Sequence, residues 1–235
     1  MLQESSYTNE LLWSCLTLLG VILIIIILAI IYYFARIAHF SIKRRRNKKS
    51  GIFKDKKKRI VNVEEVSMFI TGLATALARL SNNKVGALLV FENKDNLEKY
   101  VQLGNKMDSP FFPEFVYSIY YNHESALHDG AMIIRNLRIV ALSSYLPVSK
   151  RLLPVRYGSR HRAAFGIAER TDALAFVVSE TTGTISFMCG HEHITLSNES
   201  VNLANQLVDI FFDHYHPLAN ARTPMVVQKV KERLN

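Results

Sequence analysis

The chain has 235 residues, a formal net charge of +9 and two cysteines, which excludes a disulfide-stapled scaffold and fits a reducing compartment. The basic excess is local, because residues 36–59 carry twelve lysines and arginines and one acid, and subtracting this +11 from the total leaves −2 for the rest. A domain near neutrality does not indicate a broad phosphate-binding face, so no nucleic-acid partner is expected.

An uncharged segment, residues 11–35, is predicted to form one transmembrane helix. Twenty-five residues at ~1.5 Å each span roughly 37 Å, enough to cross a hydrocarbon core of ~30 Å. Glu4 and Glu10 precede the segment and the basic cluster follows it, which places residues 1–10 outside and the rest in the cytoplasm. A cleaved signal peptide is disfavoured, since the apolar run is long and basic residues do not precede it. The sequence therefore predicts a single-pass protein of the cell membrane.

The basic linker, residues 36–59, is too charged to fold alone and is expected to lie against anionic lipid headgroups. A cytosolic domain is predicted for residues 60–216. Residues 217–235 form a C-terminal tail in which Pro224 interrupts the chain and residues 226–234 suit a short helix.

The cytosolic domain alternates between helical and strand patterns. Helices are expected at residues 63–81, 111–121, 163–170 and 196–215. Strands are expected at 85–91, 131–134, 139–143, 173–178 and 184–187, with a hairpin turn at 136–138. This interleaving predicts an α/β fold with a mixed central β-sheet flanked by helices.

The first cluster that bears on chemistry is His128, Asp129, Gly130 and Ala131, at the entrance of a predicted strand. An acid followed by glycine lets backbone and carboxylate approach a ligand closely. An ordinary Asp-Gly turn is the alternative that this dipeptide alone favours.

The second cluster opens a predicted helix with Gly158, Ser159, Arg160, His161 and Arg162. Free backbone N–H groups at a helix start, with two guanidinium groups beside them, suit an anion. Taken alone, an exposed basic helix start is the simpler interpretation.

The third cluster, Ser179 and Glu180 followed by residues 181–183, comes directly after a predicted strand, where α/β proteins often bind ligands. A polar turn is the alternative. Standard phosphate-loop, dinucleotide and zinc-protease motifs are absent from the sequence. Cys189, His191 and His193 lack a fourth ligand at standard zinc spacing, which favours a surface turn.

Together and in this order, the clusters resemble the diadenylate cyclase (DAC) domain family. The family's Asp-Gly-Ala motif corresponds to residues 129–131, its Arg-His-Arg motif to 160–162, and its Ser-Glu segment to 179–180 with Gly183 at the end. The resemblance extends over residues 63–186. Two features depart from the usual family pattern. Thr181 replaces a second glutamate, and one membrane span is predicted where the better-known membrane-bound members have several. A single span is similar to the mycoplasma-type members.

The resemblance implies that two ATP are condensed into cyclic di-AMP with release of two pyrophosphates. Asp129, in the Asp-Gly-Ala motif with Gly130 and Ala131, would orient or deprotonate the attacking hydroxyl. Arg160 and Arg162 would neutralise phosphate charge.

Further residues are expected to bind the nucleotide and its metal. Gly158, Ser159 and Ser179 would contact phosphate, and adenine would occupy an apolar slot near Leu146. A divalent metal, Mn or Mg, would be held by groups chosen from His128, His161 and Glu180, with His161 alternatively bonding phosphate directly.

One domain holds one ATP, so catalysis would require a homodimer with its sites facing each other. Two other functions remain open at this stage. A degenerate member would sense a nucleotide at the membrane without turnover, which only Thr181 favours. A membrane scaffold would act through its basic linker.

Overall fold

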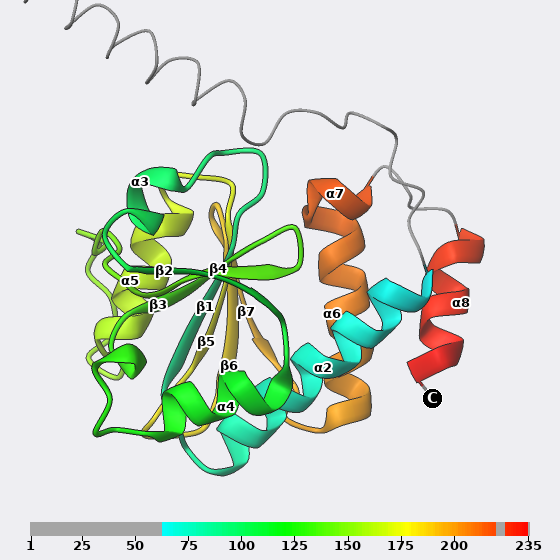
Figure 1. Ribbon diagram of the computed structural model, residues 1–235, viewed down its shortest axis with the longest axis horizontal. Helices are drawn as coiled ribbons and strands as arrows, with labels where there is room; N and C mark the ends of the chain where they lie inside the picture. Colours follow the sequence, from blue (N-terminus) through cyan, green and yellow to red (C-terminus); the bar gives the residue numbers. More distant parts are fainter. Residues whose placement is uncertain (1–62, 220–223, 235) are drawn as a thin grey trace, which may run out of the picture. The chain divides into compact units, whose positions relative to one another are not determined.

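The computed structural model describes residues 63–219 and 224–234, and the predicted span and basic linker lie outside them (Figure 1). Within these ranges, none of the helices combines the length and apolar character needed to cross a membrane. The described residues belong to one compact unit that begins at Ile60.

A seven-stranded mixed sheet forms the centre of this unit, with the strand order β2-β4-β3-β1-β5-β6-β7. Only β1 and β3 pair in parallel, and every other neighbouring pair is antiparallel. The strands are β1 (Ala87–Phe91), β2 (Asn105–Pro110), β3 (Ala131–Arg135), β4 (Arg138–Ser144), β5 (Leu174–Val178), β6 (Ile185–Cys189) and β7 (Glu192–Leu196).

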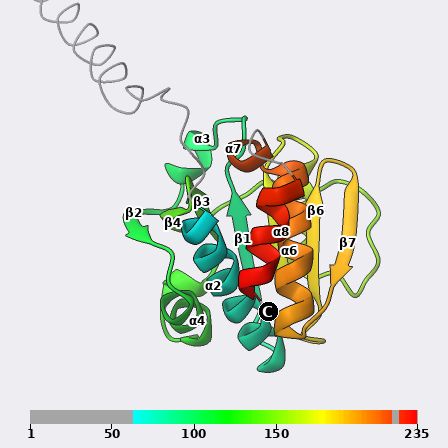
Figure 2. The same cartoon turned by 90° about the vertical axis from the view of Figure 1, so that its right-hand side faces the viewer.

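Helices cover both faces of the sheet (Figures 1 and 2). One face carries α2 (Val63–Asn82), α4 (Pro113–Tyr121), α6 (Ser200–His214) and α8 (Pro224–Leu234). The other carries α3 (Glu98–Val101) and α5 (Ser159–Ala168). Successive side chains of β1 enter opposite cores, Leu89 the first and Leu88 the second, as the strand period of two requires. The expected α/β fold with a mixed, helix-flanked sheet is confirmed.

The predicted helix over residues 163–170 begins earlier than expected. Gly158 is the N-cap of α5 and Ser159 its first residue, so the Arg-His-Arg segment lies in the first turn. Polar residues at a helix start carry no apolar periodicity, which is why the pattern placed the beginning four residues too late.

The predicted helix over residues 196–215 was wrong at its start. Leu196 ends β7, where it pairs with Ile185, and α6 begins only at Ser200. Ser197 and Asn198 lie between the two elements and break the apolar pattern, as polar turn residues do.

The hairpin between β3 and β4 has a two-residue turn, Asn136 and Leu137, both with positive φ (50° and 63°). This backbone suits the right-handed twist of the flanking strands. Arg138 belongs to β4 rather than to the turn.

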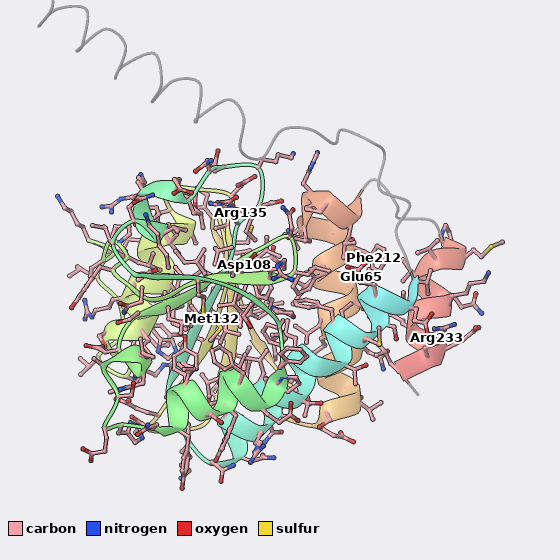
Figure 3. All side chains as sticks on the ribbon, in the orientation of Figure 1. Glu65, Asp108, Met132, Arg135, Phe212 and Arg233 are labelled. Atoms are coloured by element: carbon pink, nitrogen blue, oxygen red, sulfur yellow. The ribbon has the colours of Figure 1, made fainter. Side chains whose placement is uncertain are left out.

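The helix predicted at residues 226–234 is present as α8, which begins two residues earlier at Pro224, because proline fits the first helical turn. Val230 is fully buried, and Lys231 contacts Asp209 of α6 at 2.8 Å. Arg233 lies in the last turn of α8 (Figure 3). Its guanidinium is 3.7 Å from the Glu64 carboxylate of α2.

Five short elements were not predicted from the sequence. They are α3, β2, β7, the 3₁₀ helix η1 (Ala126–His128) and α7 (His216–Ala219). Each is short, and β2 exposes most of its side chains, so neither helical nor strand periodicity marks them.

Candidate functional site

The three sequence clusters converge at one end of the central strands of the sheet, where their strand ends line up. The parallel strands β1 and β3 both begin there, with Leu89 level with Met132. Antiparallel β5 ends there, since Val178 pairs with Ala87, and β4 ends beside the start of β3. We call this region, the starts of β1 and β3 with the ends of β4 and β5, the motif edge.

Arg160 of the second cluster contacts Glu180 of the third. Its Nη1 donates a hydrogen bond to Glu180 Oε2 at 2.8 Å. The Arg160 side chain is 17% exposed and that of Glu180 67%. The Arg160 Nε is buried and has no hydrogen-bond partner among the described residues, so the guanidinium keeps donor capacity for a further acceptor.

Gly86, directly before β1, makes this contact sterically possible. A Cβ at this position would lie 2.6 Å from Arg160 Nη1 and 2.9 Å from Glu180 Oε2. The sequence argument missed Gly86, although a glycine in front of an apolar strand signals a close approach to the backbone.

The backbone around Asp129 is fixed while its carboxylate is exposed. Gly130 has φ +108°, and a Cβ there would lie 2.8 Å from the carbonyl carbon of Ser143. The Ser143 hydroxyl is hydrogen-bonded to the carbonyl of Asp129 and lies 3.0 Å from that of Ala126. Within the described residues, the Asp129 carboxylate has no hydrogen bond or ion pair, so it is available to a ligand.

His128 is presented by η1 with one ring nitrogen engaged. Its Nδ1 lies 2.5 Å from the Ser125 carbonyl oxygen, and Ser125 Oγ accepts a hydrogen bond from Leu127 N. A carbonyl accepts only from an N–H, so Nδ1 carries the proton and Nε2 keeps its lone pair. In the neutral ring, this tautomer leaves Nε2 able to bind a metal.

The start of α5 is tied to the segment that follows β4. A Cβ on Gly166 would lie 1.9 Å from the Pro147 carbonyl oxygen, and Ser149 N donates to the Arg162 carbonyl at 2.9 Å. Leu146 is half-buried against the second core. Gly158 and Ser159 are exposed at the helix start, where the first N–H groups lack intrahelical acceptors.

His161 lies in the interior rather than among the exposed polar groups. It is 5% exposed, and its ring stacks on Tyr157 with centroids 4.9 Å apart. Burial, with a smaller effect of His193, lowers the pKa of His161 to about 4. The ring is therefore neutral at pH 7 and lies on the buried side of α5, the helix that also carries Arg160.

The loop between β5 and β6 is held by backbone contacts. Ser179 N donates to Thr184 O, and Gly183 N donates to Ser179 O. Gly183 has φ +74°, and Ser81 of α2 donates from Oγ to its carbonyl at 2.6 Å. Ser81 and Ser143 were not identified from the sequence, because isolated serines carry no pattern.

A hollow of about 410 Å³ adjoins this loop, lined by residues including Ser81, Lys84, Thr182 and Asn198. Its lining includes Thr182 and Gly183 of the third cluster but none of the residues predicted to contact nucleotide or metal. The residues predicted to contact nucleotide and metal therefore lie outside this hollow.

The donor set suits a metal that arrives with its substrate. In the described part of the chain, no group of three or more histidine, cysteine or acidic side chains is placed to hold a metal. His128 Nε2 and Glu180 remain as single donors. Magnesium-like ions commonly take one or two protein ligands and complete their shell with water and substrate phosphates.

Comparison with known proteins identifies the family of the chain. The profile of the DAC domain, described as DisA bacterial checkpoint controller nucleotide-binding, matches residues 74–193. The diadenylate cyclase of Mycoplasma pneumoniae is 43% identical over 159 residues, covering 68% of this chain and 76% of that protein. The diadenylate cyclase of Mycoplasma genitalium is 44% identical over 140 residues, covering 60% and 70%.

Solved structures show the same fold. A double mutant of DacA from Staphylococcus aureus has a TM-score of 0.58 and 34% identity, covering 65% of this chain and 98% of that one. A hypothetical membrane spanning protein from Bacillus cereus has a TM-score of 0.52 and 38% identity, covering 54% and 62%. The chain belongs to the DAC domain family, as its three motifs predicted.

Proposed function

We propose that this chain is a diadenylate cyclase, which condenses two ATP into cyclic di-AMP and two pyrophosphates at the motif edge. The observation that carries the proposal is the contact of Arg160 with Glu180 over Gly86, beside the start of β3 that holds Asp129. The named activity of the two Mycoplasma relatives supports it.

Each half-reaction exchanges one bond to phosphorus. The 3′-oxygen of one ATP attacks the α-phosphorus of the other, a phosphodiester forms, and the bond to pyrophosphate breaks. The hydroxyl proton passes to Asp129 or through it to water. Repeating the step with the roles exchanged closes the ring. This chemistry asks the protein mainly for alignment and for stabilisation of phosphate charge.

The charged groups of α5 suit the phosphates. Arg160 has an unpaired buried Nε, and the exposed helix start at Ser159 offers backbone N–H donors. Arg162, in the same turn, adds a second guanidinium, and the Ser179 hydroxyl a further donor. The half-buried Leu146 provides an apolar surface for adenine.

Glu180 and His128 would hold a divalent metal, Mn or Mg, that the nucleotide carries. Such a cation neutralises part of the triphosphate charge. Glu180 also bonds Arg160, so the same carboxylate orients the guanidinium before a nucleotide binds.

A second copy of the chain supplies the second nucleotide. The exposed Asp129 and one phosphate site per domain suit two domains that face each other. The segment before α5 carries apolar side chains that are unusually open to solvent, Tyr145 at 71%, Leu152 at 104% and Val155 at 100%. Such a surface beside a site suits coverage by a partner domain.

The proposal places the catalytic domain at the cytoplasmic face of the membrane. The uncharged segment 11–35 and the basic linker 36–59 support anchoring. The solved relative from Bacillus cereus is itself described as a membrane spanning protein.

Incubation of the full-length protein in detergent with ATP and Mn²⁺ or Mg²⁺, followed by chromatography of the products, tests the function. Formation of cyclic di-AMP, and its loss on chelation with EDTA, is the expected result. ATP that is retained without turnover would identify a nucleotide sensor instead. A protein that neither binds ATP nor turns it over would instead be a scaffold.

A further inference from the structure

A buried tyrosine on α4 contacts the sheet directly behind the motif edge. Tyr120 is 1% exposed, and its hydroxyl donates to the Leu88 carbonyl of β1 at 2.6 Å. The same oxygen accepts a hydrogen bond from Met132 N of β3 at 3.1 Å. Met132 lies between the sheet and α4 (Figure 3).

These two backbone atoms belong to the parallel ladder between β1 and β3. Glu92 N donates to the Ile134 carbonyl at 2.8 Å, and the strands pair Leu89 with Met132 in register. Parallel strands exchange hydrogen bonds at every second residue. Two residues before Ile134, the same pattern therefore pairs Met132 N–H with the Leu88 carbonyl. The Tyr120 hydroxyl contacts both of these groups.

The next residues towards the strand starts belong to the site. Asp129 lies three positions before Met132, and Gly86, which supports Arg160 and Glu180, lies two positions before Leu88. The Tyr120 hydroxyl therefore bridges β1 and β3 three residues from Asp129 along the chain. It sets the spacing of the two strands at this point.

The hydroxyl remains a donor across the physiological pH range. Burial strongly raises the pKa of Tyr120, while its backbone hydrogen bonds and the nearby Arg160 oppose this shift. A buried hydroxyl that satisfies two backbone groups is costly to remove, since both groups lose a partner.

We propose that Tyr120 is a positioning residue for the cyclase reaction: its hydroxyl, bonded to Leu88 and Met132, fixes the start of β3 and with it the carboxylate of Asp129 relative to Arg160. The proposal rests on the proposed function for its kinetic consequence. Its structural consequence, a fixed start of β3, does not depend on that function.

Substitution Tyr120→Phe tests the hydroxyl while it keeps the ring in the core. Without the hydroxyl, Met132 N–H and Leu88 O keep only their pairing in the parallel ladder, and the start of β3 loses its hydrogen-bonded link to α4, which loosens it. We expect kcat to fall by about 10- to 100-fold, because misplacement of a reacting group by about 1 Å has an effect of that order. KM for ATP should change less than about threefold, since the phosphate-binding groups come from α5 and β5.

The matched control is Tyr215→Phe, which removes a hydroxyl from an equally buried ring that packs on Phe91 and Phe211. This variant reports the general cost of such a change in the same core. An equal fall of kcat in both variants, or an unchanged kcat in Tyr120→Phe, would overturn the proposal.

Amide hydrogen exchange of the full-length protein separates this proposal from the proposed function. Peptides that cover residues 126–133 should exchange faster in Tyr120→Phe and at the wild-type rate in Tyr215→Phe. Unchanged exchange in that segment of Tyr120→Phe overturns the positioning role, whether or not the wild-type protein makes cyclic di-AMP. Absence of cyclic di-AMP from the wild type, with faster exchange in the variant, instead counts against the cyclase function alone.

Discussion

The Arg160 guanidinium lies 2.8 Å from the Glu180 carboxylate, and both rest on the backbone of Gly86. An exposed ion pair of this kind contributes little to stability, about 0–1 kcal/mol. The ion pair instead orients the Arg160 guanidinium, because Glu180 holds Nη1 and leaves the buried Nε free to bond another acceptor.

Substitution Arg160→Ala is expected to weaken ATP binding by at least about tenfold, which corresponds to roughly 1.4 kcal/mol. The physical reason is the loss of charge-assisted hydrogen bonds to phosphate oxygens. Isothermal titration with a non-hydrolysable ATP analogue measures the effect directly.

The control for this variant is Arg138→Ala. Arg138 forms a 2.6 Å ion pair with Asp108 at the beginning of β4, at the end of the strand remote from the motif edge. Its removal should leave ATP affinity unchanged. Equal affinity of Arg160→Ala and the wild type would remove Arg160 from the phosphate site.

Substitution Gly130→Ala is expected to destabilise the fold by about 1–3 kcal/mol and to abolish turnover. The residue has φ +108°, and the added methyl group would meet the Ser143 backbone at 2.8 Å. Urea unfolding measures the free-energy difference, and product chromatography measures the activity.

Gly158→Ala provides the comparison. Gly158 has φ −72° and no atom within 4 Å of an added Cβ, so the loss should stay below about 1 kcal/mol, the usual range for an N-cap change. If the two alanine variants were equally stable, the positive φ at Gly130 would not be a structural requirement.

The fold class and the three motifs could be predicted from the sequence because both are local signals. Buried strands such as β1 are continuous apolar runs, and α2 shows a clear helical period. The motif residues are adjacent in the chain, so their identity needs no knowledge of the fold.

What the sequence could not predict are contacts between distant residues. Gly86 meets Arg160 across more than seventy positions, and the Ser81 hydroxyl reaches the Gly183 carbonyl across 102 positions. The burial of His161 was missed partly for the same reason, since His193 approaches it only after β7 has paired with β6. The predicted roles of Asp129 and Arg160 remain predictions until the variants are measured.

The neutral, buried His161 predicts how stability depends on pH. Its pKa is about 4 in the folded protein and near 6.5 when unfolded, so the unfolded state binds more protons between these values. The contribution of His161 to the free energy of unfolding should therefore be constant above pH 6.5. It should fall by about 1–3 kcal/mol as the pH drops from 6.5 towards 4.

Urea unfolding of the wild type at pH 7 and pH 5, with NMR titration of the His161 ring, measures this dependence. His191→Asn, on the exposed turn between β6 and β7, should leave the pH profile of stability unchanged. A His161 ring that titrates near pH 6.5 in the folded protein would contradict the prediction.

The carboxylate of Asp129 provides the most direct test of the chemistry. Asp129→Asn keeps the shape and exposure of the side chain but removes its negative charge and its basicity. ATP binding should stay within about threefold of wild type, because the phosphate-binding groups are untouched. Formation of cyclic di-AMP should fall by at least about 10²-fold, the range expected for loss of a positioned general base.

The matched change is Asp108→Asn, which neutralises an exposed carboxylate on β2 that pairs with Arg138 (Figure 3). This variant should turn over ATP at the wild-type rate, since β2 lies at the outer edge of the sheet. Normal turnover by Asp129→Asn would show that the exposed carboxylate takes no part in the reaction. The role of the motif edge would then reduce to binding phosphate through Arg160.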